Sequence, residues 1–227
     1  MNGAIVGIGG GGFLFDDARL LQERYLLSLL RRRERQRVLY LGTAAGDGER
    51  AQLRFLQAFL KLGADPVTLP FFPYDMQRDY ASEVLAADLV YVGGGNTVAM
   101  LAVWREFGFD TALRRAWAAG TAFAGISAGA NCWFERYVTD SIPGGGIRAG
   151  LGWLPGTFCP HLDSQAWRQP LLAAAPALPV YGAADGVAMR FENGRCVEAV
   201  SDRVALAAVQ RLSAEAPLAP MFTRVLS

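Results

Sequence analysis

The amino-acid sequence predicts an α/β fold, a single-domain three-layer sandwich with a mostly parallel central sheet and a C-terminal hairpin. Two observations support this prediction. Short apolar runs alternate with helical patterns along the first half of the chain, which is typical of a parallel sheet covered on both faces. Hydrophobic residues make up 52% of the 227 residues and charged ones 19%, which is enough apolar material for one large core.

The first half of the chain contains five expected strands with helices between them. Each expected strand is a short apolar run, and each expected helix carries apolar residues on one face. The strands are expected at residues 4–9, 37–43, 66–72, 89–92 and 122–126. The helices are expected at about 18–33, 48–62, 96–107 and 111–119, with a further short helix between the third and fourth strands. In such sheets, ligands bind at the carboxyl ends of the strands.

The second half has a looser pattern. Residues 141–156 contain four glycines in a short span and are expected to form a loop. A strand at 157–161, a helix at 165–174 and strands at 178–182 and 205–212 are expected around it. Two further strands, 187–191 and 196–200, flank Asn193-Gly194, which predicts a hairpin. No linker or repeat divides the chain, so residues 1–227 are predicted to form one domain.

Charge and cysteine content exclude several function classes. The net charge of +1 gives no general reason to bind nucleic acid or an anionic membrane, and the arginines at positions 31–37 follow a helix, where cations suit its dipole. No segment approaches the ~20 apolar residues that cross a bilayer, and the N-terminus lacks the features of a signal peptide. Three cysteines without a C-x-x-C pattern are typical of reduced thiols. We expect a cytoplasmic protein without nucleic-acid or membrane partners, with a homodimer as a candidate assembly.

A candidate nucleophile lies at the end of the fifth expected strand. Gly125-Ile126-Ser127-Ala128-Gly129 has the form G-x-S-x-G, between a buried strand and the start of a helix. A serine on such a tight strand–turn–helix corner projects out of the sheet, and the flanking glycines leave room for the turn and for a substrate. A plain glycine-rich connection is the alternative. The position of the motif favours a nucleophilic Ser127.

The partners of Ser127 follow from the few candidates that the chain offers. A serine hydroxyl needs a base, and His161 is the only histidine, at the end of an expected strand and at the same edge of the sheet. A carboxylate must then fix the tautomer of the histidine. Asp185 follows the strand at 178–182 and is preferred, whereas Asp140 lies in a loop with no strand to aim it. Asp140 remains the alternative third member.

Backbone N–H groups are the expected oxyanion stabilisers. Ala128 directly follows the nucleophile, and the GGGNT turn at 93–97 follows a strand and opens a helix.

Two other patterns in the sequence are weaker indications of a binding site. Gly7–Gly12 fits the dinucleotide-binding pattern G-x-G-x-x-G, but the second expected strand does not end in the acidic residue that such a site uses. Cys159, His161 and Asp163 alternate as metal ligands on a strand do, but the chain has no second cluster that would supply further ligands. We therefore expect no cofactor and no metal.

The GGGNT turn at 93–97, the GISAGAN segment at 125–131 and Pro160-His161 occur in the order in which similar motifs occur in a known family. Together they resemble the dipeptidase E (aspartyl dipeptidase) and cyanophycinase family of serine peptidases, whose fold is similar to that of class I glutamine amidotransferases. The resemblance covers most of the chain. It implies Ser127 as nucleophile, His161 as base and the N–H groups of Gly95 and Ala128 as oxyanion hole, with Asp185 or, in older descriptions of the family, Asp140 as third member.

The chain also departs from this family. Dipeptidase E grips the aspartate side chain of its substrate with an arginine, and the matching position here is Ser164, with Arg168 one helical turn further on. Asn96 and Arg168 are the candidate substrate-binding residues, and aspartyl (Asp-X) specificity is not expected to follow from the resemblance. The expected function is a serine exopeptidase that cleaves short peptides through an acyl-enzyme.

Two alternatives accompany this expectation. The first is an amidase-like or metabolite-binding relative that keeps the three residues without dipeptidase activity. The second is an α/β-hydrolase esterase, which is disfavoured because that fold places its histidine far downstream, whereas His161 follows Ser127 by only 34 residues.

Overall fold

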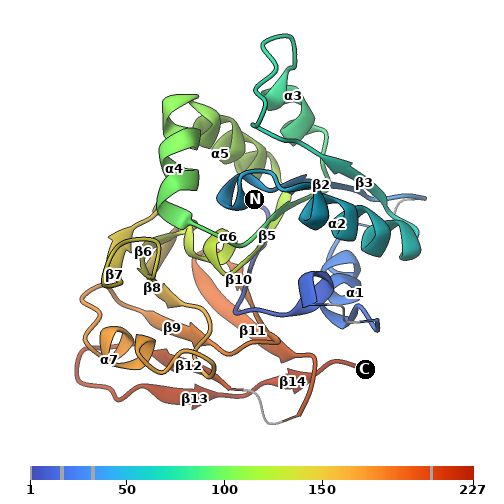
Figure 1. Cartoon of the computed structure of the whole chain (residues 1–227). Coiled ribbons are helices and arrows are strands. Elements are labelled where there is room, and N and C mark those ends of the chain that lie inside the picture. Colours follow the sequence, from blue (N-terminus) through green and yellow to red (C-terminus); the bar gives the residue numbers. More distant parts are fainter. Residues whose placement is uncertain (1, 16–17, 32–33, 205–206) are drawn as a thin grey trace.

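The fold is built around a twisted eight-stranded sheet. A computed structural model describes residues 2–15, 18–31, 34–204 and 207–227 (Figure 1). The sheet has the order β14-β11-β10-β1-β5-β4-β2-β3, and the five neighbouring strands β1, β5, β4, β2 and β3 pair in parallel. Its strands are β1 (Ile5–Ile8), β2 (Arg37–Leu41), β3 (Asp65–Thr68), β4 (Leu89–Val92), β5 (Ala122–Ile126), β10 (Val187–Glu192), β11 (Arg195–Ser201) and β14 (Arg224–Val225).

Helices cover both faces of this sheet, as Figure 1 shows. Alternate residues of each parallel strand point to opposite faces. Val38 and Tyr40 pack in the core that contains Phe55 of α2 (Glu49–Lys61), whereas Leu39 packs in the core that contains Trp104 of α4 (Thr97–Glu106). The helices are α1 (Leu21–Ser28), α2 (Glu49–Lys61), α3 (Tyr80–Leu85), α4 (Thr97–Glu106) and α5 (Phe109–Ala119). The predicted α/β class is confirmed. Residues 16–17, which precede the first predicted helix, and residues 32–33, at its predicted end, lie outside the described residues.

A second sheet of six strands follows the Ser127 motif, with the order β13-β12-β9-β8-β6-β7. The sequence did not predict this separate sheet, and the expected loop at 141–156 contains β7, so that expectation is wrong. The strands are β6 (Phe134–Thr139), β7 (Gly146–Ala149), β8 (Leu154–Cys159), β9 (Val180–Ala183), β12 (Ala208–Arg211) and β13 (Ala219–Met221), with α7 (Arg168–Ala173) beside them. The predicted start of a strand at 205–206 lies outside the described residues.

Aromatic packing joins the two sheets into one core. Phe134 and Phe158 of the second sheet stack with their ring centroids 4.8 Å apart, and Phe134 meets Phe191 of the first sheet edge to face at 5.1 Å. The predicted hairpin connects β10 and β11, and its turn residues Asn193 and Gly194 have φ of 50° and 76°. These left-handed angles are those that an Asn-Gly turn adopts.

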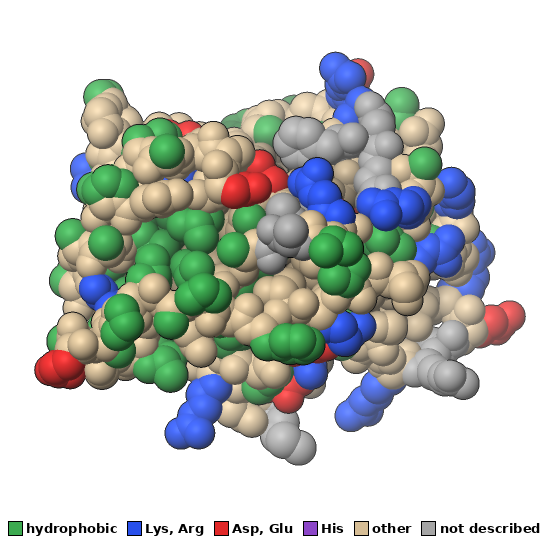
Figure 2. All heavy atoms as spheres, turned by 90° about the horizontal axis from the view of Figure 1, so that it is seen from below, with side chains coloured by type: hydrophobic (Ala, Val, Ile, Leu, Met, Phe, Trp, Pro, Cys, Tyr) green, Lys and Arg blue, Asp and Glu red, His purple; other side chains and the backbone are tan. Residues whose placement is uncertain are grey.

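The outer surface carries both apolar and basic areas. Figure 2 shows a broad area of hydrophobic side chains on the left of one face, with arginines and lysine mainly to the right and at the rim. Large apolar side chains such as Val197, Leu212 and Phe222 are exposed. Exposed apolar residues are common on monomers, so the homodimer stays a prediction. In the described part of the chain, no helix is long and apolar enough to span a membrane.

Candidate active site

Ser127 occupies a sharp turn between β5 and the short helix α6 (Ala128–Asn131). Its φ is 55° and its ψ is −112°, a conformation that residues with side chains seldom adopt. Such backbone strain costs about 1–3 kcal/mol and is concentrated at functional sites. The backbone N–H of Ser127 donates to Ile8 O at 2.9 Å, which ties the turn to β1.

The two glycines of the motif are required by the close approach of α6 to the sheet. A Cβ atom on Gly125 would lie 2.1 Å from Gly129 O, and one on Gly129 would lie 2.2 Å from Val92 O. Both obstacles are backbone atoms, which cannot swing aside. The motif therefore fixes the position of Ser127 by backbone contact.

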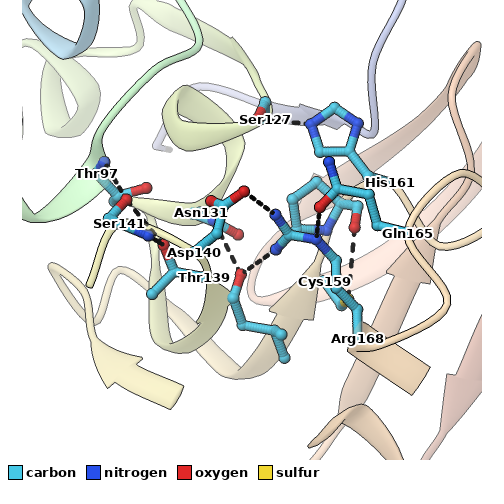
Figure 3. A network of polar contacts seen from close by, with 12 residues as sticks. Thr97, Ser127, Asn131, Thr139, Asp140, Ser141, Cys159, His161, Gln165 and Arg168 are labelled. Carbon is cyan, nitrogen blue, oxygen red and sulfur yellow. Dashed lines mark hydrogen bonds and ion pairs between the residues drawn. The ribbon is translucent and has the colours of Figure 1, made fainter. Parts of the chain in front are cut away.

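Ser127, His161 and Asp185 form a continuous chain of hydrogen bonds. The Oγ atom of Ser127 lies 2.8 Å from His161 Nε2, and His161 Nδ1 lies 2.6 Å from Asp185 Oδ1. His161 follows the end of β8 with a φ of 56°, and Asp185 lies between β9 and β10. Figure 3 shows the ring of His161 facing Ser127. This order of hydroxyl, imidazole and carboxylate can move a proton from the serine to the histidine.

The surroundings of Asp185 favour its ionised form. Burial raises the pKa of this carboxyl, but hydrogen bonds from His161 and Ser164 and the positive charge of Arg203 outweigh burial and leave the pKa below its usual value. The backbone N–H of Asp185 donates to Asp163 Oδ1 at 2.9 Å. An anionic Asp185 is therefore available to His161 Nδ1 at neutral pH.

Glycines also leave the space that this chain of hydrogen bonds occupies. A Cβ atom on Gly10 would lie 2.1 Å from Asp185 Oδ1 and 3.1 Å from His161 Cε1. A Cβ atom on Gly94 would lie 3.3 Å from Ser127 Cβ. The glycine-rich segment after β1 and the turn after β4 therefore both border the site.

In the described part of the chain, two backbone N–H groups next to Ser127 lack hydrogen-bond acceptors. Among the described residues, neither the N–H of Gly95 nor that of Ala128 has a partner. Gly95 has a φ of 139° and lies so close to Ala44 O that a Cβ atom would be 2.2 Å from it. Unpaired N–H groups beside a nucleophile are suited to bind a developing oxyanion.

The comparisons with known proteins identify the family of the chain. The model of peptidase family S51 matches residues 5–199. The chain belongs to peptidase family S51. This is a family of serine peptidases, so the chain is a serine peptidase, and the resemblance to dipeptidase E is confirmed.

Relatives and solved structures extend the family assignment. The chain is 40% identical over 219 residues to the uncharacterized peptidase YgaJ of Bacillus subtilis (strain 168), covering 95% of this chain and 94% of YgaJ. A peptidase from an acI-B1 actinobacterium has a TM-score of 0.67 at 18% identity, over 98% of this chain and 95% of that one. A putative peptidase E protein from Listeria monocytogenes EGD-e has a TM-score of 0.66 at 17% identity, over 87% and 98%. These two structures support the fold.

Asn96 caps a helix in this S51 peptidase. Its side-chain oxygen accepts from the N–H of Ala99 at 2.9 Å, and its amide nitrogen donates to Ser141 O at 3.3 Å. Both functional groups therefore contact the protein, although Asn96 itself is exposed. The cap gives Asn96 a structural role beside the predicted substrate-binding one.

Arg168 is buried, and its guanidinium contacts other groups of the protein. Its side chain is 2% exposed, and its guanidinium donates to Gln165 Oε1 at 2.7 Å and to Val138 O at 2.9 Å. Figure 3 shows Arg168 within this network of polar contacts rather than beside Ser127. Because Nε, Nη1 and Nη2 each have a partner within the protein, this arrangement does not support the prediction that Arg168 holds substrate.

Asp140 belongs to the network of Arg168. Its carboxylate lies 3.2 Å from Arg168 Nη2, and the side chain is 59% exposed. His161 instead takes Asp185 as its carboxylate partner. The geometry therefore favours Asp185 over the alternative, Asp140.

The other patterns in the sequence serve the fold around the site. Cys159 is buried, and burial raises the pKa of its thiol to about 12. Asp163 holds the backbone of Asp185, so the two side chains that flank His161 in the alternating pattern do not converge with it. In the described part of the chain, no cluster of His, Cys, Asp and Glu is suited to hold a metal ion.

Sequence reasoning missed Gly10 and Asp163 as parts of the site. Gly10 lies in a glycine run that resembles a nucleotide-binding loop, and only the fold reveals that its missing side chain makes room for Asp185. Asp163 lies two residues after the histidine, a signal that could have suggested a role beside His161.

Proposed function

We propose that this S51 peptidase hydrolyses short peptides with Ser127 as nucleophile, His161 as general base and acid, and Asp185 as the carboxylate that orients His161. The observation that carries the proposal is the pair of hydrogen bonds, 2.8 Å from Ser127 to His161 and 2.6 Å from His161 to Asp185. The strained turn at Ser127 supports it, since it presents the hydroxyl at the sheet edge.

The proposed reaction has two halves. Ser127 Oγ attacks the carbonyl carbon of the substrate and passes its proton to His161 Nε2, and the oxyanion accepts from the N–H groups of Gly95 and Ala128. The imidazolium then gives the proton to the amide nitrogen, the C–N bond breaks, and the amine leaves an acyl ester on Ser127. Water attacks this ester with His161 again as base, which releases the acid and restores the serine hydroxyl.

The decisive experiment replaces the nucleophile. Ser127→Ala is expected to lower the hydrolysis of dipeptides and tripeptides by about 10⁴-fold or more and to abolish labelling by a serine-reactive fluorophosphonate. Ser213→Ala, at an exposed serine, serves as the control and is expected to keep both activities. Unchanged peptide turnover in Ser127→Ala would disprove the proposal.

We also propose that the protein acts in the cytoplasm. Its cysteines Cys132, Cys159 and Cys196 are free thiols, two of them buried, which suits a reducing compartment. Cell fractionation followed by detection of the protein tests this location.

A further inference from the structure

A pocket of about 280 Å³ opens directly beside Ser127 and His161. Ligand pockets for larger small molecules measure about 300–1,000 Å³, so this pocket is sized for one side chain or a very short peptide. Its wall is contributed by segments that are far apart in the sequence: Gly10, Leu14, Tyr40, Ala45, Ala51, Gly94, Gly95, Ile126, Ser127 and His161.

The side chains that line the pocket away from Ser127 and His161 are apolar or neutral. Leu14, Ala51 and Ile126 present only hydrocarbon, and among the described residues no acidic or basic side chain other than the imidazole lines the pocket. Burial, followed by the nearby charge of Asp47, raises the pKa of Tyr40 to about 12, so its phenol stays neutral. The pocket therefore offers no full charge to a substrate side chain.

An acidic side chain would need a cation in this pocket. A carboxylate that loses water without gaining a charged partner is strongly disfavoured. Arg168, the cation that the sequence suggested for this purpose, is buried against Asp140, Gln165 and Val138 O. An apolar side chain meets no such penalty, because its transfer from water into the pocket is itself favourable.

We propose that this pocket holds the uncharged, apolar side chain of a residue that flanks the scissile bond. The S51 peptidase then cleaves short peptides with leucine, methionine or a similar residue at that position, and discriminates against aspartate. This inference rests on the proposed function, since it requires acyl transfer at Ser127.

One neighbouring feature offers a rival outcome. An adjacent cavity shares Leu14 and Ala51 with the pocket, and Arg50 and Arg54 are in its lining. If the side chain of an acidic substrate reaches these arginines, the enzyme would prefer aspartate over an apolar residue. The test must therefore include acidic peptides and an Arg50→Met variant.

The experiment measures kcat/KM of the full chain on two dipeptide series. In the first series the residue before the scissile bond is Ala, Leu, Met, Asp or Lys and the residue after it is alanine. In the second series the two positions are exchanged. Leu or Met is expected to exceed Asp and Lys by at least about tenfold in one of the two series, as hydrophobic pockets discriminate on this scale. Preference for Asp, lost in Arg50→Met, would overturn the inference.

Two variants test the pocket itself. Ala51→Phe fills it and is expected to reduce kcat/KM for the leucine peptide about tenfold more than for Ala-Ala. The matched control Leu53→Phe lies on the same helix at a position that is 55% exposed, and no change is expected. Leu14→Ala, which removes volume from the wall, is expected to shift the preference toward larger side chains, and provides the test if Ala51→Phe does not fold.

Fluorophosphonate labelling of Ser127 separates the two proposals. If Ser127 is labelled and Ala-Ala is cleaved, but leucine has no advantage in either series, the pocket inference fails alone. If Ser127 is not labelled and no peptide is cleaved, the proposed function fails and the inference falls with it.

Discussion

The nucleophile and its base are held in place by different kinds of contact. Ser127 lies on a turn whose neighbours are packed backbone against backbone, with Gly125 against Gly129 O and Gly129 against Val92 O. The position of this turn depends mainly on backbone contacts, including the hydrogen bond from the N–H of Ser127 to Ile8 O. The turn leaves Ser127 little freedom to move, because Val92 O belongs to strand β4 and Gly129 O to helix α6, and neither carbonyl moves without disturbing the backbone packing.

His161 and Asp185 are held mainly by polar side chains. Asp185 accepts from His161 and receives support from Asp163, while the turn after His161 is tied by Gln165 and Arg168. Such bonds contribute about 0.5–1.5 kcal/mol each, or about twice that where a charge takes part. We therefore expect substitutions that add atoms beside Ser127 to lower activity strongly. Substitutions of the polar residues around His161 are expected to lower activity less the farther they lie from His161.

The largest effect on the polar side is expected at Asp185. Asp185→Asn keeps the shape but removes the charge that supports an imidazolium, and is expected to lower kcat/KM about a thousandfold or more. Asp140→Asn is the matched control and is expected to change kcat/KM less than threefold, since the Asp140 side chain is 59% exposed and His161 takes Asp185 as its carboxylate partner. The reverse ranking of the two variants would identify Asp140 as the third member.

The Asp185→Asn variant also gives a pH test of stability. The pKa of Asp185 is lowered in the folded protein, so its stabilising contribution is present above the unfolded pKa of about 3.9 and is lost as the pH falls through the folded value. Melting temperatures measured from pH 7 downwards should therefore fall less steeply below pH 4 in Asp185→Asn than in the original chain.

On the steric side, Gly129→Ala is expected to lower kcat/KM about a hundredfold, since its Cβ atom would displace α6 and the turn at Ser127. The free energy of unfolding should fall by about 1–3 kcal/mol. Gly48→Ala is the control, because its Cβ atom would meet nothing closer than 3.7 Å. Kinetics and denaturant titration of both variants check this, and full activity in Gly129→Ala would contradict it.

The Ser127 side was also the more predictable from the sequence, and the reason is physical. The strand, turn and helix around Ser127 are contiguous, so their pattern of glycines and apolar residues is readable locally. His161 could be chosen because the chain contains no other histidine. Asp185 followed from its place after a strand.

The remaining features depend on contacts between distant segments. Strand β6 carries Glu135 and Arg136, so its apolar alternation is weak, and the second sheet was not predicted. The burial of Arg168 was missed because arginine is almost never fully buried unless it is paired, and its partners come from Val138, Asp140 and Gln165. The pocket beside Ser127 is likewise assembled from distant parts of the chain.

The smallest of these effects on activity is expected at Arg168. Its substitution tests whether the polar contacts that hold His161 extend as far as this arginine. Arg168→Met removes the ties to Gln165 and Val138 O, and is expected to lower the free energy of unfolding by about 2–3 kcal/mol. Because the turn at 161–165 then loosens, kcat should fall about tenfold with KM little changed. Arg148→Met, at an exposed arginine of β7, is the control and should stay within about 0.5 kcal/mol.

The split between kcat and KM decides what Arg168 does. A residue that positions His161 affects the chemical step, whereas a residue that holds substrate affects KM when its contribution is the same in the ground state and the transition state. If Arg168→Met raises KM more than tenfold at constant kcat, the guanidinium must leave Asp140 to meet the substrate. The polar side would then be a movable part of the site, in contrast to the rigid turn at Ser127.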